Sequence, residues 1–206
     1  MTAFLSIIIL SYLMGSIPTS LIAARLLRGI DLRQYGSGNA GATNAIRILG
    51  WKPGLAVMAV DIAKGVIPTL WLAPFAYRTI LCSDAAVQLT AGCAAIIGHI
   101  WTVFARFRGG KGVGTGAGVL LVLYPGTLAV CLIIFGLVAS VTRVVALGSI
   151  SAALAFPLVL SVFRYTFGMP VEECLYWFSF VAAALILFTH RSNIKNIMTR
   201  LNGKRV

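Results

Sequence analysis

The sequence is poor in acidic side chains. Its 206 residues include 5 Asp and Glu against 17 Lys and Arg, and only 11% are charged, where a soluble domain has roughly 25%. So few carboxylates argue against a pair for general acid–base catalysis and against a carboxylate-rich metal site. We therefore expect no metal ion and no cofactor.

From the sequence pattern we expect neither paired cysteines nor a cleavable leader. No spacing typical of disulfides or metal sites joins the four cysteines, which are Cys82, Cys93, Cys131 and Cys174. The start, MTAFLSIIIL, lacks a basic segment, and Arg25 and Arg28 follow the apolar stretch. This pattern predicts a retained first span with the N-terminus outside. Without a linker or repeat, residues 1–206 are expected to form a single domain.

Long apolar runs are what the sequence has in abundance. Hydrophobic residues make up 59% of the chain, and runs of about 20 residues recur, which indicates a polytopic helical membrane protein. The expected apolar segments are 3–27, 53–77, 85–104, 113–141, 145–163 and 172–190. Segment 113–141 is ambiguous. One helix would be roughly 43 Å long against a core of about 30 Å, and two helices split at Pro125–Gly126 would be about 20 Å each.

Charge distinguishes six spans from seven. With seven spans, the basic tail lies inside with most other cations, as the positive-inside rule requires. The inside set is then Arg25, Arg28, Arg33, Arg47, Lys52, Arg106, Arg108, Lys111, Arg143, Arg191, Lys195, Arg200, Lys204 and Arg205. Only Arg78 and Arg164 stay outside, and Lys64 lies within a span. The predicted fold is an all-α bundle of seven transmembrane helices, N-out and C-in.

This topology places the polar glycine-rich segments on one face, and GSGNAGATN (36–44) is the most unusual of them. Glycines allow positive φ and expose backbone N–H groups, which form anion-binding nests, often at a helix N-terminus. The candidate ligands here are Gly36, Ser37, Gly38, Asn39, Thr43, Asn44 and, three residues on, Arg47. The alternative is a plain loop, but a turn needs only one or two such residues. We interpret the segment as an anion site.

The second motif, GHIWTVFARFRGGKGVGTG (98–116), surrounds Lys111 with Gly109, Gly110 and Gly112. It is not a Walker A loop, because no Ser or Thr follows the lysine. Its alternative is a flexible basic loop. Gly114 and Gly118 are expected to allow close helix packing.

Five further positions have simpler explanations as well as functional ones. His99 and His190 end apolar spans and could be interface residues, and Ser149 could bond within its own helix. Asp61 and Lys64 are three residues apart and are expected to pair within the bundle.

Taken together, several motifs resemble the bacterial membrane glycerol-3-phosphate acyltransferases of the PlsY family. They are GSIPTS, DLRQYGSGNAGATN with Arg47, DIAKG, GHIWTVFARFRGGKG and HRSNI, in order over nearly the whole chain. The sequence departs where Arg108 replaces a common lysine and Ala146 a common serine, and the tail lacks a frequent glutamate. The resemblance implies seven spans and acyl transfer from acyl phosphate to glycerol 3-phosphate, which yields lysophosphatidate.

The resemblance also implies roles for the candidate residues. Ser37, Asn39 and their backbone are assigned to the acyl-phosphate head, and Lys111 and Arg47 are assigned to clamping phosphates. His99 is counted with Ser37, Arg47 and Lys111 as a catalytic residue. Asn193, His190 and Ser149 are placed at the glycerol phosphate. The expected partners are the two substrates and membrane lipid, with no nucleic acid, and a monomer is compatible with the sequence. The expected location is the bacterial inner membrane, with the site facing the cytoplasm.

Two other classes are considered. A transporter of organic phosphates would usually bind its substrate at the bilayer midplane between repeats, and no repeat is found. A structural membrane subunit would leave the glycine clusters unexplained.

Overall fold

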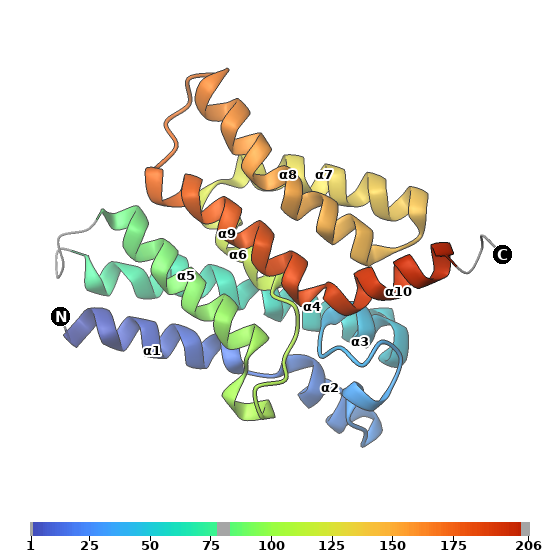
Figure 1. The fold of residues 1–206 in the computed structure, drawn as a ribbon. Coiled ribbons are helices and arrows are strands. Elements are labelled where there is room, and N and C mark those ends of the chain that lie inside the picture. The colour runs from blue at the N-terminus through green and yellow to red at the C-terminus, as the bar shows by residue number, and fades with distance from the viewer. Residues whose placement is uncertain (1, 78–82, 203–206) are drawn as a thin grey trace. The chain divides into compact units, whose positions relative to one another are not determined.

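The computed structural model describes residues 2–77 and 83–202, with the side chains of 200–202 left out. Some residues used in the topology and cysteine arguments lie outside the described residues, namely Arg78, Cys82, Lys204 and Arg205. Every regular element in the described ranges is helical, which confirms the all-α prediction (Figure 1). The chain divides into two compact units, Met1–Pro125 and Gly126–Val206, and each is described by itself.

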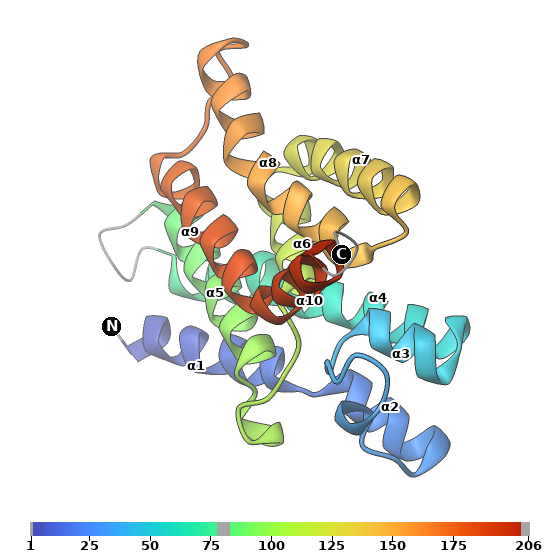
Figure 2. The ribbon, with the colours of Figure 1, turned by 45° about the vertical axis from the view of Figure 1, so that its right-hand side comes forward.

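The first unit contains the helices that carry the two glycine-rich motifs. Its elements are α1 (Thr2–Ser16), α2 (Thr19–Arg28), η1 (Leu32–Gln34), α3 (Ala42–Leu49), α4 (Trp51–Ile67), η2 (Pro68–Leu72), η3 (Ala73–Ala76), α5 (Asp84–Ile100), η4 (Val103–Ala105) and α6 (Val113–Leu123). Helix α3 folds back along the start of α4 (Figure 2). The polar stretch after the first apolar run is therefore partly helical.

The first apolar run is not one continuous helix. The expected span over 3–27 is present as a candidate membrane span, Thr2–Arg28, but it consists of two helices, since α1 ends at Ser16 and α2 begins at Thr19. Pro18 lacks a backbone N–H and cannot continue the hydrogen-bond ladder, so the helix stops before it. The break leaves backbone carbonyls inside the apolar region, and these need donors from elsewhere.

Glycines let the helices of the first unit approach closely. A Cβ at Gly15 of α1 would overlap with the Ala95 carbonyl oxygen of α5, and one at Gly118 of α6 would overlap with the Ile62 carbonyl oxygen of α4. Backbones in such contact need glycine, as in membrane helix pairs. The predicted packing role is thus confirmed for Gly118.

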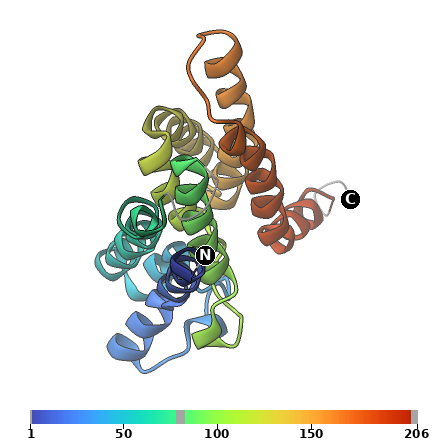
Figure 3. The same cartoon turned by 90° about the vertical axis from the view of Figure 1, so that its left-hand side faces the viewer.

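The second unit consists of α7 (Pro125–Thr142), α8 (Val145–Tyr165), α9 (Glu173–Thr189) and α10 (Arg191–Asn202). Helices α8 and α9 form a hairpin (Figure 3). Near its turn, Arg164 contacts Glu173 at 2.5 Å and lies 5.1 Å from the centre of the Tyr176 ring. The described part of the basic tail, for which no helix was predicted, forms α10 (Arg191–Asn202).

The predicted division of 113–141 is confirmed, because α6 ends at Leu123 and α7 starts at Pro125. Among the described residues, 5 helical segments are long and apolar enough to cross a membrane when α1 and α2 are counted together as Thr2–Arg28, and the α9–α10 pair, bent by 56°, makes a sixth if it is one span. Helix α6 has 11 residues and is about 16 Å long, shorter than a hydrocarbon core. Seven spans and the N-out orientation stay predictions.

Candidate active site

The first glycine-rich loop, which we define as residues 31–41, is shaped by Asn44 at the start of α3. The Asn44 side chain is 1% exposed. Its Oδ1 accepts from the Ser37 amide at 3.0 Å, and its Nδ2 donates to the carbonyls of Leu32 at 3.2 Å and Tyr35 at 3.0 Å. Both amide hydrogens are thereby used within the loop. The structure gives Asn44, proposed above as a substrate ligand, the role of an internal brace.

Two glycines of this loop adopt the positive φ that their motif predicts. Gly36 has φ 61° and Gly38 has φ 71°, and a Cβ at Gly36 would overlap with Asn44 Oδ1. Gly41 differs, since its φ of −142° is extended and it precedes the first residue of α3. Ser37, between the two turning glycines, is exposed.

Helix α3 begins inside the motif, at Ala42, and no side chain caps its N-terminus. The first N–H groups of a helix have no partner in the helix and, with the helix dipole, favour an anion. Thr43 in the first turn and Arg47 in the last are both exposed. The predicted combination of a glycine loop and a helix N-terminus is therefore present.

The second glycine-rich loop, residues 105–112, is fixed to the end of α5. The amides of Gly109 and Gly110 donate to the carbonyls of Ile100 and His99, each at 3.0 Å. A Cβ at Gly109 would overlap with the His99 carbonyl oxygen, so only glycine fits there. Gly112, with φ 83°, leads directly into α6, whose N-terminus also lacks a side-chain cap.

Lys111 lies between these glycines, just before the N-terminus of α6. It is half-buried, and burial lowers the pKa of its ammonium to about 8. A partly desolvated cation beside backbone N–H groups interacts more strongly with an anion than a fully exposed lysine does. The position suits the predicted phosphate clamp.

Arg33 joins the two loops. Its Nη1 donates to the Ala105 carbonyl at 3.0 Å, while its Nη2 contacts Asp31 Oδ2 at 2.7 Å. This guanidinium hydrogen-bonds to the Asp31 carboxylate and lowers its pKa. A Cβ at Gly110 would lie 3.0 Å from the Ala40 carbonyl oxygen, so the loops also touch directly. Arg33 was predicted only as a topology charge, and its role between the loops has no signal in the sequence.

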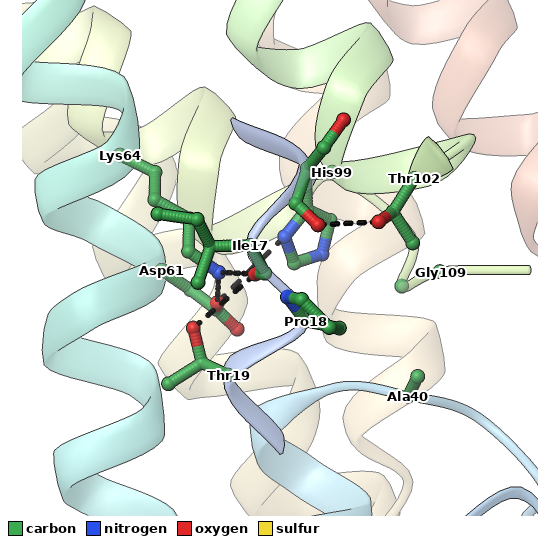
Figure 4. A pocket seen from close by; sticks show the side chains of 11 residues that line it. Ile17, Pro18, Thr19, Ala40, Asp61, Lys64, His99, Thr102 and Gly109 are labelled. Carbon is green, nitrogen blue, oxygen red and sulfur yellow. Dashed lines mark hydrogen bonds and ion pairs between the residues drawn. The ribbon is translucent and has the colours of Figure 1, made fainter. Parts of the chain in front are cut away.

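A pocket lies where the broken first helix meets these loops (Figure 4). Its lining comes from four of the sequence motifs and consists of Ser16, Ile17, Pro18, Thr19, Ala40, Asp61, Lys64, His99, Thr102, Gly109 and Gly110. Lys64 Nζ lies 2.8 Å from Asp61 Oδ1, and the two residues are 3% and 4% exposed. The predicted intramembrane pair is confirmed.

His99 connects this pair to the second loop. The residue is 8% exposed, and its Nδ1 lies 3.7 Å from Asp61 Oδ1. On the other side of the ring, a Cβ at Gly110 would overlap with His99 Nε2. Sequence analysis treated His99 and the Asp61–Lys64 pair separately, because residues on different helices give no spacing signal.

The remaining candidates belong to the second unit. Ser149 Oγ donates to the Val145 carbonyl at 3.2 Å, which confirms the simple alternative of a bond within its helix. His190 ends α9 and is 3% exposed, and its Nδ1 lies 2.9 Å from the Ile186 carbonyl, which can only accept. Asn193 is half-buried in the first turn of α10. Their place at a substrate stays a prediction.

Within residues 2–77 and 83–202, no group of three or more His, Cys, Asp and Glu side chains is arranged to hold a metal ion.

Comparison with known proteins gives consistent matches over nearly the whole chain. The family model described as glycerol-3-phosphate acyltransferase matches residues 5–200. The glycerol-3-phosphate acyltransferases of Chlorobaculum parvum and Chlorobaculum tepidum are each 44% identical over 97% of this chain and 95% of their own length.

Two solved structures are also similar, and both are crystal structures of PlsY (YgiH), described as an integral membrane glycerol 3-phosphate acyltransferase. The glycerol 3-phosphate form has a TM-score of 0.81 and 37% identity, and the lysophosphatidic acid form has a TM-score of 0.78 and 36% identity. Each match covers 95% of this chain and 92% of the solved one. The chain with these two joined glycine-rich loops therefore belongs to the PlsY family of glycerol-3-phosphate acyltransferases, integral membrane enzymes of phospholipid biosynthesis.

Proposed function

We propose that the protein transfers a fatty acyl group from acyl phosphate to glycerol 3-phosphate, with lysophosphatidate and inorganic phosphate as products. The observation that carries the proposal is the junction of the two glycine-rich loops, which Arg33 holds together through Ala105. Each loop ends at a helix N-terminus without a side-chain cap, at Ala42 and at Val113. Two such termini in adjoining loops suit a reaction between two phosphate compounds.

The charges near this junction have the sign that such a reaction needs. Lys111 stands at one helix N-terminus and Arg47 on the other helix, whereas the Asp31 carboxylate is already paired with Arg33 at 2.7 Å. In this proposal Lys111 and Arg47 clamp the phosphates, and Ser37 and Asn39 with their neighbouring amides hold the acyl-phosphate head. His190, Asn193 and Ser149 bind glycerol 3-phosphate.

The proton of the attacking hydroxyl goes to the departing phosphate. The glycerol 3-phosphate oxygen bonds to the acyl carbonyl carbon, and the anhydride bond from that carbon to the phosphate oxygen breaks. The released phosphate accepts the hydroxyl proton, since a phosphate monoester has a second pKa near ~6 and suits proton transfer at neutral pH. No acyl-enzyme forms, and the protein supplies orientation and positive charge.

The membrane arrangement follows the charge distribution. We propose seven spans with α6 as a short one, a single domain over residues 1–206, and a site that faces the cytoplasm at the bacterial inner membrane. The acyl chain then lies among apolar helices. A reporter fused after Val206, which lies outside the described residues, should read cytoplasmic, and a periplasmic signal would contradict the seven-span topology.

The competing function is transport of an organic phosphate. Purified protein is incubated with acyl phosphate and labelled glycerol 3-phosphate, in parallel with acyl-CoA as donor, and the same protein is tested for uptake in proteoliposomes. The proposal predicts labelled lysophosphatidate with acyl phosphate alone as donor. Uptake without product would support the transporter, and product from acyl-CoA only would refute the donor assignment.

A further inference from the structure

The break between α1 and α2 places backbone carbonyls in an apolar region, and two other helical segments satisfy them. Thr102 Oγ1 donates to the Ser16 carbonyl, and Lys64 Nζ donates to the Ile17 carbonyl at 2.6 Å. An unsatisfied carbonyl in this region would cost several kcal/mol. Lys64 thus has one task that needs its ammonium but does not need Asp61.

Asp61 has no such backbone task to explain its burial. Its Oδ1 lies 2.8 Å from Lys64 Nζ and 3.7 Å from His99 Nδ1, so one carboxylate oxygen faces both groups (Figure 4). Burying an ion pair gives little net stability compared with apolar side chains of similar size. The pair alone is therefore a weak reason for a carboxylate at this position.

The imidazole of His99 supplies the stronger reason. Its two nitrogens face different partners, with Nδ1 toward Asp61 and Nε2 toward Gly110 of the second glycine-rich loop. The His99 carbonyl also holds the Gly110 amide at 3.0 Å, so ring and loop are fixed to each other. The orientation and tautomer of this ring therefore bear directly on the loop that carries Lys111.

We propose that Asp61 is a positioning residue of the acyltransferase reaction, which holds His99 in the tautomer protonated at Nδ1, with Lys64 keeping the Asp61 carboxylate charged and in place. A carboxylate beside one ring nitrogen selects the tautomer that carries its proton there. His99 Nε2 then offers a lone pair at the loop junction, where it can accept from the hydroxyl of glycerol 3-phosphate that is not acylated.

The distance between His99 Nδ1 and Asp61 Oδ1 is consistent with a positioning role for Asp61. A hydrogen bond would need Nδ1 and Oδ1 about half an ångström closer than the observed 3.7 Å. Such contacts in enzymes without substrate are often long and tighten in the complex. The charged groups that face the ring are Asp61 and Lys64, and Lys64 is already bound to Asp61 and Ile17.

The two histidines of the chain make a direct test possible. In a His190→Gln background, ¹⁵N-histidine labelling reports on His99 alone, and the nitrogen shifts identify the tautomer. We expect protonation at Nδ1 only. After Asp61→Asn, and in the double variant Asp61→Asn/Lys64→Met that leaves no buried charge unpaired, we expect this preference to be lost. In the His190→Gln protein without further changes, protonation of His99 at Nε2 or at both nitrogens would overturn the proposal. An unchanged tautomer of His99 in both Asp61 variants would overturn it as well.

Kinetic measurements then distinguish a positioning role of Asp61 from a role in the stability of the fold. In an otherwise unmodified chain, Asp61→Asn keeps the Lys64 donor to the Ile17 carbonyl and should lose roughly 10–100-fold in kcat/KM for glycerol 3-phosphate, the effect seen when a group that orients a metal-ligating histidine is lost. The double variant also loses that donor, so it should unfold at a lower temperature but show the same loss in kcat/KM when assayed below its unfolding transition. Asp84→Asn, an exposed acid at the start of α5, is the matched control and should retain kcat/KM. A double variant as active as the control would overturn the proposal. The spectroscopic test needs no substrate, so it stands whichever acyl donor the enzyme uses.

Discussion

The kcat/KM of the enzyme should fall in mildly alkaline solution, because Lys111 loses its proton there. Burial lowers the pKa of its ammonium to about 8. A lysine is a cation below its pKa, so about 90% is charged at pH 7 and about 10% at pH 9. If this cation clamps a phosphate substrate, kcat/KM should fall nearly tenfold between pH 7 and pH 9. The substrate phosphates, with a second pKa near ~6, do not change charge in this interval.

The assay is the initial rate of lysophosphatidate formation at glycerol 3-phosphate concentrations well below KM, with a blank without enzyme at each pH. Because kcat/KM reports the free enzyme and kcat the complex, the fall in kcat should begin at higher pH, where bound phosphate keeps the lysine charged. Lys111→Arg is the matched variant, since a guanidinium stays charged over the whole interval. Its profile should be flat, whatever its absolute rate. A flat profile for the parent enzyme, or the same fall in Lys111→Arg, would refute the reasoning.

Five further substitutions probe the site. Lys111→Ala and Arg47→Ala should each lower turnover by roughly 10²–10³, the usual cost of one well-placed electrostatic donor, and near-normal turnover in a folded Lys111→Ala protein would make Lys111 only a topology charge. His99→Gln and His190→Gln should each raise KM for a phosphate substrate more than they lower kcat, and a kcat loss of roughly 10²–10⁴ at unchanged KM would identify a general base instead. Asn44→Ala removes three hydrogen bonds of the first loop and should cost about 1–3 kcal/mol of stability by calorimetry. A stability loss near zero would contradict the bracing role of Asn44.

The sequence was informative wherever local chemistry dictates structure. Apolar run length predicted the helices, and Pro125 correctly marked the boundary between α6 and α7. The positive φ values of Gly36 and Gly38 followed from their motif, and the Asp61–Lys64 pair followed from helical spacing. Pro18 offered the same kind of signal as Pro125, but it lies within one apolar run that was predicted as a single span, and no break was predicted there.

Contacts between distant segments were beyond prediction. The bond from Arg33 to Ala105 joins residues 72 positions apart, and no periodicity relates them. Asn44 was predicted as a substrate ligand because its side-chain amide stands among other candidate ligands. Only the folded loop shows that both hydrogens of this amide bond to the loop's own carbonyls. His99 near Asp61 likewise depends on the packing of α4 against α5.

The most direct test of the account follows phosphate release when purified enzyme is mixed with acyl phosphate, first alone and then with glycerol 3-phosphate. Direct transfer between two bound phosphate compounds predicts no release above the blank without glycerol 3-phosphate. With it, one phosphate should appear for each lysophosphatidate formed. A burst of phosphate with acyl phosphate alone, together with acylated protein in the mass spectrum, would contradict direct transfer and the role assigned to the two glycine-rich loops.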